Sequence, residues 1–320
     1  MNTTGGISVI DPVGKAFDWT LQVLFRPMDP GKWFTIGFCA WLAFLGESGG
    51  GGVHFPWGGG GQGGHGVGGD FRAQWEEFHR YLIANLYWMI PVAAALIVLS
   101  IALMVLFTWL SSRGKFMFLH CVAQNQAEVT WPWNHYGPLG GSLFRFRLVL
   151  GLLCLTAILP LICLAVFGVF RMVMHSKPDF GLILLTVGSL LLVFVFAVVC
   201  WLVKRIVEDF LVPIMYQRGI LWREGWSETM ALISRNLGVF VLYFLFRIVL
   251  GIATGVMVLM VILITCCIAG CLMLIPYIGT VIMLPVLVFY RAYSALFLAQ
   301  FGPEFDVFAT PQVDGTFPSP

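Results

Sequence analysis

Long uncharged stretches alternate with short polar stretches along most of this chain. An apolar run of about 20 residues forms a helix long enough to cross the roughly 30 Å core of a bilayer. The region between Arg80 and Arg113 holds 32 uncharged residues, and the region between Arg247 and Arg291 holds 43, enough for two crossings. Gly270 and Pro276 mark the turn between those two, because Gly and Pro interrupt helices. The pattern predicts five spanning helices, over residues 86–108, 148–170, 181–203, 243–266 and 277–298.

A sixth apolar stretch, residues 33–46, is shorter. Only 14 residues separate Lys32 from Glu47, a length more typical of a re-entrant or interfacial segment. With six spans and the N-terminus inside, fourteen Lys and Arg residues lie on the cytoplasmic side and four lie outside. Without the crossing at 33–46, the bias falls to eleven against seven. The positive-inside rule therefore favours six spans with both termini in the cytoplasm.

Four further segments are expected outside the bilayer core. Residues 11–27 and 70–82 each place apolar side chains on one helical face, which predicts interfacial amphipathic helices. Residues 46–69 contain 14 Gly among 24 and predict a flexible extracytoplasmic loop. Residues 302–320 are polar and Pro-rich and predict a disordered cytoplasmic tail. Residues 1–301, which include the first three of these segments, are expected to form one membrane domain. The apolar face of the 11–27 helix is made of Val13, Phe17, Leu21 and Leu24.

Composition excludes several classes of protein. Hydrophobic residues make up 59% of the 320 residues and charged residues only 11%, whereas a soluble domain carries about 25% charged residues. A soluble fold, a disordered chain and a disulfide scaffold are therefore excluded. The net charge of +2 gives no sign of nucleic-acid binding. We predict an all-α fold: a polytopic membrane helix bundle of about six transmembrane helices, in the inner (plasma) membrane of a bacterium.

One short motif occurs twice. The sequence FRLVLG at 146–151 recurs as FRIVLG at 246–251, and each copy opens a predicted span after a cytoplasmic segment. The repeat favours a duplicated hairpin, with copies at 86–170 and 181–266. Chance matches in apolar sequence are the alternative.

The second cytoplasmic segment, or elbow, carries a resemblance to known families. It contains EDFLVPIM at 208–215, GIL at 219–221, EGW at 224–226 and a polar run to Asn236. Together with Ile10-Asp11-Pro12 and Phe25-Arg26-Pro27, these motifs resemble an uncharacterised family of bacterial multi-span inner-membrane proteins. The elbow is also similar to the membrane domain attached to some glycerophosphodiester phosphodiesterases. The resemblance implies no catalytic residue, and no water-facing stretch is long enough for a catalytic barrel of about 250 residues.

Candidate functional residues lie at the predicted cytoplasmic edge. The adjacent acids Glu208 and Asp209 are suited to binding a cation or relaying protons. Their spacing from Lys204 and Arg205 equally predicts a solvated face of i,i+4 ion pairs, each worth a few tenths of a kcal/mol. Arg247 and Arg291 are the cations nearest to the apolar phase. An Arg near a span end extends to the interface, whereas a deeper one requires a counter-ion, for which Glu208 or Asp209 are the candidates.

No motif for catalysis, cofactor binding or metal binding is present. The six His are scattered, and most of the eight Cys lie in apolar segments, where Cys behaves as a small hydrophobic residue. Only Cys121 is expected in a cytoplasmic loop. The sequence therefore predicts a non-catalytic integral membrane protein, a scaffold that binds membrane lipids, a protein partner or a second copy, and not nucleic acid. The alternative is a transporter or lipid-handling permease, and a membrane-embedded enzyme is the least favoured.

Overall fold

A computed structural model describes residues 7–46, 71–174, 180–265, 268–273 and 275–308. Every regular element within these ranges is a helix, so the all-α prediction is confirmed. In chain order they are α1 (Asp11–Phe25), α2 (Pro30–Ala43), α3 (Phe71–Gln124), α4 (Thr130–His135), α5 (Gly137–Met174), α6 (Phe180–Ile206), the π-helical turn η1 (Val207–Leu211), α7 (Val212–Arg218), α8 (Trp222–Arg235), α9 (Leu237–Ile264), α10 (Ile268–Met273), α11 (Pro276–Ile282), α12 (Leu284–Ala299) and the 3₁₀ turn η2 (Pro303–Phe305).

Four of the described helical segments are long and apolar enough to cross a membrane. Four of the predicted spans lie on them, and few of their apolar side chains are buried within the protein. Large exposed apolar surfaces of this kind are typical of contact with a membrane. The segments are Tyr87–Gln124, Gly137–Arg171, Phe180–Arg218 and Leu237–Ile264.

The other two predicted spans correspond to shorter helices. Residues 277–298 do not form one helix but divide between α11 and α12 at Met283. The break has a local cause, since Pro285 has no N–H and its ring disfavours a helical turn before it. Residues 33–46 lie largely on α2, which has only 14 residues. The described part of the chain thus shows four helices of spanning length rather than the six expected.

Helix α2 packs against the C-terminal part of α3. Lys32 Nζ donates to Asn125 Oδ1 at 2.6 Å, and Ser111 Oγ donates to the carbonyl oxygen of Ala43 at 2.7 Å. The two helices therefore run antiparallel, with the start of α2 beside the end of α3. The glycine at position 114 allows close approach here, because a Cβ atom on it would lie 2.5 Å from the Ala43 nitrogen. Accordingly, α2 lies beside the polar end of α3 and not along its apolar length.

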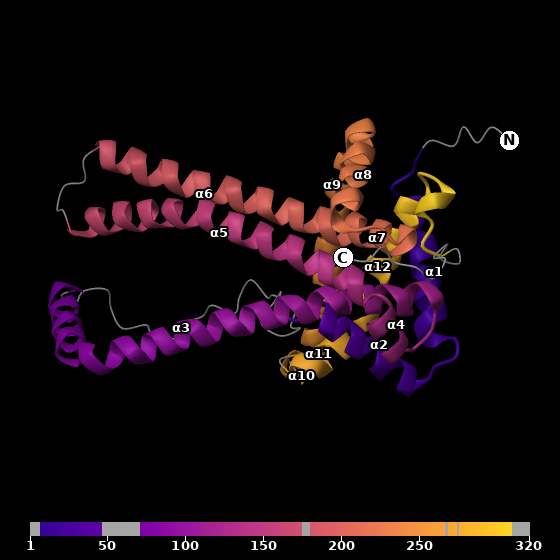
Figure 1. Ribbon diagram of the computed structural model, residues 1–320, viewed down its shortest axis with the longest axis horizontal. Coiled ribbons are helices and arrows are strands. Elements are labelled where there is room, and N and C mark those ends of the chain that lie inside the picture. The colour runs from indigo at the N-terminus through magenta and orange to yellow at the C-terminus, as the bar shows by residue number, and fades with distance from the viewer. Residues whose placement is uncertain (1–6, 47–70, 175–179, 266–267, 274, 309–320) are drawn as a thin grey trace.

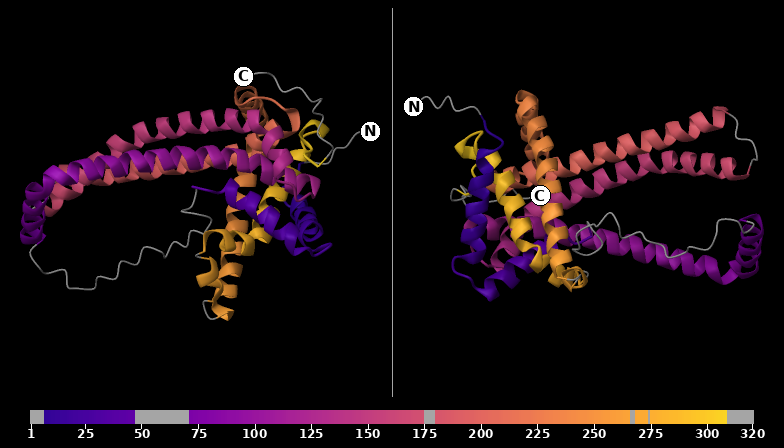
Figure 2. Two further views of the ribbon diagram at one scale, coloured as in Figure 1. Left: turned by 60° about the horizontal axis from the view of Figure 1, so that its bottom comes forward. Right: turned by 180° about the vertical axis from the view of Figure 1, so that it is seen from behind.

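The molecule consists of a compact base from which long helices project. Helices α5 and α6 run side by side away from the base, and α3 extends in the same general direction (Figure 1). Helix α9 runs crosswise to these three, as both further views show (Figure 2). The base contains α1, α2, α4, α7, α8, α11 and α12. The two directions of long helices meet at η1, where the α6 segment enters the base.

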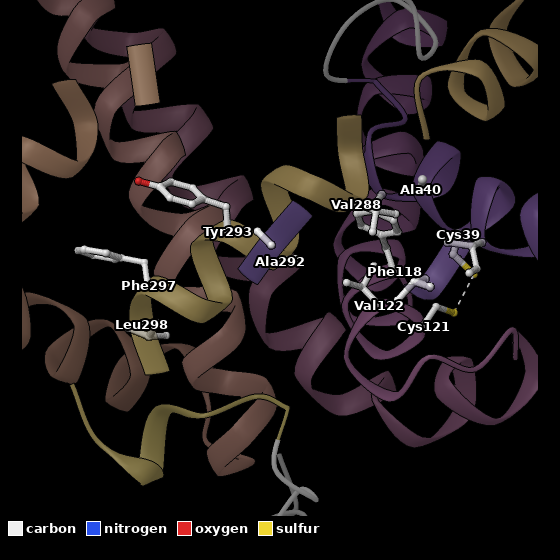
Figure 3. Close-up of a cluster of buried hydrophobic side chains, with 14 of the residues drawn as sticks. Cys39, Ala40, Phe118, Cys121, Val122, Val288, Ala292, Tyr293, Phe297 and Leu298 are labelled. Carbon is white, nitrogen blue, oxygen red and sulfur yellow. Dashed lines mark hydrogen bonds between the residues drawn. The ribbon is translucent and has the colours of Figure 1, made fainter. Parts of the chain in front are cut away.

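The hydrophobic core lies in the base and centres on α12. Tyr293 and Phe297 of α12 are fully buried, and they pack against Phe210 of η1 and Tyr243 of α9. Figure 3 shows Tyr293 and Phe297 of α12 pointing away from a second buried group, which α2 and α3 form and which includes Cys39. Because α12 contributes to both groups, this short apolar helix serves as the centre of the base.

Helix α1 confirms a helix over most of residues 11–27, but its buried face only partly matches the predicted one, from which Leu24 is buried. Ala16 and Thr20 are buried against neighbouring elements, chiefly α12, whereas Phe17 is 57% exposed. Small side chains allow two helices to approach closely, so α1 is a packed helix of the base and not only an interfacial one. The predicted interfacial helix at 70–82 is the beginning of the continuous helix α3.

The predicted tail begins with a packed segment. Val307 is fully buried and Phe305 is 8% exposed, so residues 302–308 belong to the base and the prediction of disorder is wrong for them. Residues 309–320 and the glycine-rich loop at 47–69 lie outside the described ranges.

Candidate functional site

The candidate site forms where the helix of α6 passes through η1 into α7. Here the backbone N–H of Val212 donates to the carbonyl oxygen of Val207, five residues earlier, as in a π-helix. The next residue, Pro213, has no N–H, so the carbonyl of Glu208 cannot receive the corresponding bond. Such π-turns are common at functional sites. The irregular turn places both acids of the predicted pair, Glu208 and Asp209, inside the base, where both are buried.

Glu208 is shared by three cations. Lys115 Nζ lies 2.9 Å from its carboxylate, Arg205 Nη1 lies 3.3 Å away, and Lys204 Nζ lies 3.9 Å away. The Lys115 side chain is only 6% exposed, whereas Lys204 is 46% exposed.

Asp209 pairs with Arg247 from α9. Arg247 Nη1 lies 3.0 Å from Asp209 Oδ2, and the two side chains are 11% and 5% exposed. Arg247 also donates to the hydroxyl of Tyr243 at 3.0 Å, and that hydroxyl donates to Asp209 at 3.3 Å. Arg247 therefore has the buried counter-ion that its position in an apolar helix requires.

Arg291 from α12 binds backbone rather than a carboxylate. Its Nη1 donates to the carbonyl oxygen of Glu208 at 2.6 Å, the group that Pro213 leaves without a helical donor, and its Nη2 donates to the carbonyl of Lys115 at 3.4 Å. Its Nε is buried without a hydrogen-bond partner among the described residues.

The structure thus brings together all four residues singled out from the sequence: Glu208, Asp209, Arg247 and Arg291. It corrects the expectation of a solvated ion-pair face, because both acids are buried and Arg205 pairs with Glu208 instead of Asp209. Binding of a cation by the acid pair is disfavoured, since each carboxylate already has a basic partner. No group of three or more potential metal ligands occurs within the described ranges.

A cavity of about 640 Å³ adjoins these side chains. This volume lies in the range of small-molecule and cofactor sites. As formed by the described residues, its wall has five cationic side chains, two carboxylates and an apolar part. The apolar part includes Trp201 of α6 together with Ile248 and Ile252 of α9, which are 41%, 46% and 64% exposed. The charged residues are Lys115, Lys204, Arg205, Arg247, Arg291, Glu208 and Asp209.

The first copy of the repeated motif makes a related but uncharged contact. Arg147 Nη1 donates to Ser111 Oγ at 3.1 Å and to Ser112 Oγ at 3.2 Å, on the helix that precedes it. Arg247, at the same place in the second copy, likewise reaches back to the preceding long helix. The duplication of the hairpin remains a prediction, and only its second copy carries the acids.

Cys39, Cys121 and His120 occupy packed positions. Cys39 and Cys121 are fully buried with their sulfur atoms 3.7 Å apart (Figure 3). Cys121 therefore lies in the core, and the prediction that it lies in a loop is wrong. His120 Nδ1 lies 3.0 Å from the hydroxyl of Tyr216.

Sequence reasoning missed three residues of the site. Lys115 lies 93 residues before Glu208, and no local spacing connects the two. Tyr243 and Tyr290 could not be singled out among the aromatic residues of apolar segments. Tyr290 lines the cavity, and its ring centroid lies 5.0 Å from the Arg247 guanidinium carbon. The useful signal for Lys115 was its position between the apolar residues of α3, where a buried cation needs a partner.

The fold defines the class of protein. All-α architecture and four segments of spanning length and apolarity are typical of an integral membrane protein. The chain belongs to a family of unknown function (DUF7544), whose model matches residues 7–283. No curated protein and no solved structure gives a match to this chain.

Proposed function

We propose that this protein is a non-catalytic integral membrane protein that binds a membrane lipid in the cavity beside Glu208. The observation that supports the proposal is the combination of charged and apolar walls in one cavity. A lipid has the same two parts, a polar headgroup and hydrocarbon chains. Trp201, Ile248 and Ile252 lie on helices that are long and apolar enough to span the bilayer, so acyl chains in this part of the cavity remain next to lipid.

The proposal includes a location and an orientation. We place the protein in the bacterial inner membrane with both termini in the cytoplasm, because basic residues are concentrated on the base side of the predicted spans. The similarity of the elbow to the membrane domain of some glycerophosphodiester phosphodiesterases fits a role close to phospholipids. The proposal also includes binding of a protein partner or of a second copy of this chain.

Two glycines of α9 provide a matched test. Gly251 lines the cavity and Gly255, one turn further along, does not, and neither has an atom within 4 Å of an added Cβ. A Gly251→Leu side chain is expected to occupy the apolar part of the cavity, whereas position 255 is not among the residues that line it. Native mass spectrometry of the protein from nanodiscs measures lipid retained at fixed stoichiometry. We expect one retained lipid for the parent and Gly255→Leu and loss for Gly251→Leu. Equal retention by both variants contradicts the proposed location, and no retained lipid in the parent contradicts the function.

A lipid-handling permease is the second candidate. It requires a cavity lined by Arg247 or Arg291, and the cavity is lined by both. Reconstitution in liposomes distinguishes the two functions: a permease moves a labelled lipid between leaflets and loses this flux with Arg247→Gln, while a binding protein shows no flux above empty liposomes.

A further inference from the structure

We infer that Cys154 of α5 and Cys200 of α6 are a site of disulfide formation, with a quinone dissolved in the lipid phase as the oxidant. The site is separate from the proposed function, since it needs no ligand in the cavity. Three features of the structure carry it: the distance between the two sulfur atoms, the packing of α5 against α6, and the apolar surroundings of the pair.

The two thiols lie close together across the α5–α6 contact. The Cys200 thiol donates to the Cys154 sulfur atom, with 3.2 Å between the two sulfurs. A disulfide bond is about 2.0 Å long, so the two atoms need to approach by only about 1.2 Å to bond. By comparison, Cys39 and Cys121 are 3.7 Å apart, and the Cys121 thiol also donates to the carbonyl oxygen of Glu128. Cys154 and Cys200 are therefore the pair better placed to bond.

Helix packing, and not a loop, sets the distance between these sulfurs. Helices α5 and α6 run side by side away from the base (Figure 1), and the two cysteines are 46 residues apart in the chain. The same helices meet again at Gly168 and Thr186, since a Cβ atom on this glycine would clash with the threonine hydroxyl. Thr186 is only 4% exposed. Two contacts along one pair of helices thus hold the thiols opposite each other.

The surroundings of the pair favour an oxidant from the lipid phase. Both cysteines are partly exposed, and both lie on helical segments that are long and apolar enough to span a bilayer. Their chain neighbours Leu153 and Val199 are apolar and are 61% and 50% exposed. A charged, water-soluble oxidant is costly to bring into such a region. A quinone is apolar and accepts both electrons and protons, so it suits this position.

The oxidation conserves atoms and electrons. The two S–H bonds break and one S–S bond forms, which releases two protons and two electrons. The quinone takes up both protons and both electrons and becomes a hydroquinone, so no other reactant is needed. Cys200 directly precedes Trp201 of the cavity wall. The new bond therefore ties this part of the wall to α5.

Intact-mass measurement of the protein in nanodiscs tests the site. The parent protein is reduced, freed of reductant and incubated with a short-chain ubiquinone. We expect its mass to fall by two hydrogen atoms, and peptide mapping without reductant to join Cys154 to Cys200. Cys154→Ala is expected to keep its mass. Cys163→Ala is the matched control, because it removes an exposed cysteine of the same helix and should behave as the parent does.

Three results overturn the inference. They are an unchanged mass of the parent, a stable quinone adduct in place of the loss of hydrogen, and a disulfide that joins other cysteines, such as Cys39 and Cys121. The unfolding midpoint of each reduced variant shows that the helices remain packed.

A water-soluble oxidant tests the source of the oxidising equivalents. Oxidised glutathione is charged and is offered at the same concentration as the ubiquinone. We expect it to form the bond between Cys154 and Cys200 about tenfold more slowly. Equal rates overturn the assignment of the oxidant to the lipid phase.

Unfolding in SDS tests whether the bond fits the folded hairpin. A disulfide restricts the unfolded chain, so the oxidised parent is expected to unfold at a higher SDS concentration than the reduced parent. Cys154→Ala is expected to unfold at the same concentration before and after treatment with the ubiquinone. An oxidised parent that unfolds at an equal or lower concentration overturns the site, because the bond then does not fit the packing of α5 and α6.

Discussion

Removing the charge of Asp209 tests whether the buried ion pair is held as the structure shows. Asp209→Asn keeps the shape of the side chain and one acceptor oxygen but removes the counter-ion of Arg247, 3.0 Å away. Glu208 cannot replace it fully, because three other cations already share that carboxylate. The guanidinium of Arg247 then stays buried without a carboxylate, in contact only with neutral groups such as the Tyr243 hydroxyl and the Tyr290 ring.

The expected loss follows from burial. Two unit charges about 4 Å apart interact with about 4 kcal/mol at an effective dielectric constant of 20, and breaking a buried pair by removing one partner costs about 3–5 kcal/mol. The pair of Arg218 and Glu228 provides a control at the same 3.0 Å separation, with side chains 38% and 32% exposed. An exposed pair of this kind is worth about 0.2–1 kcal/mol. We expect Asp209→Asn to destabilise the protein by about 3 kcal/mol and Glu228→Gln by less than about 1 kcal/mol.

Unfolding in mixed micelles with increasing SDS measures both free energies. Reactivity of the buried thiols of Cys39 and Cys121 reports the loss of the base independently. A double variant, Asp209→Asn with Arg247→Gln, is expected to lose at least about 1 kcal/mol less than the sum of the single variants. If Asp209→Asn is no more destabilising than Glu228→Gln, or if the two single effects add, the pair is not the buried contact described above.

Three further predictions concern packing and topology. Gly114→Ala is expected to lower the free energy of unfolding by about 1–3 kcal/mol, because its Cβ meets the α2 backbone. Gly141→Ala is the control, since this glycine also lies in a helix but has open space around it, and it should not destabilise the protein in the same SDS titration. Val307→Asp places a charge in a fully buried position and is expected to cost about 2–4 kcal/mol, whereas a mobile tail would tolerate it. Gln62→Cys and Gln312→Cys, in a background without native cysteines, are expected to label from opposite sides under the six-span topology; labelling from one side supports four spans.

Hydrophobicity alone predicted the long helices, because a helix needs little more than sufficient length and apolar side chains to span a bilayer. It did not predict where an apolar stretch stops being one helix. Residues 277–298 carry no charge apart from Arg291, but Pro285 divides them, and the second part becomes the centre of the base. Similarly, the large apolar residues of α1 suggested one face, while the small Ala16 and Thr20 allow α12 to approach on another. Packing depends on size and shape, which a hydrophobic pattern does not record.

The candidate site was predictable in its residues but not in its chemistry. Glu208 and Asp209, four residues after Lys204 and Arg205, have the spacing of an exposed ion-pair face, and that spacing is correct for Lys204 and Glu208. The interpretation changes because the helical segment containing them, Phe180–Arg218, has 39 residues. At about 1.5 Å per residue it is roughly 58 Å long, nearly twice a bilayer core of about 30 Å.

The part of this segment that extends beyond the bilayer enters the base instead of water. Pro213 then changes the helical register through the π-turn, and the rotation directs Asp209 to Arg247 and leaves the Glu208 carbonyl to Arg291. The length of the helix and the π-turn both have a local origin in the sequence, which is a long apolar run followed by two acids and a proline. Their result depends on α3, α9 and α12, which contribute Lys115, Arg247 and Arg291 from distant parts of the chain. The same sequence spacing therefore gives a surface pair in an isolated helix and a cation-rich cavity wall in this fold.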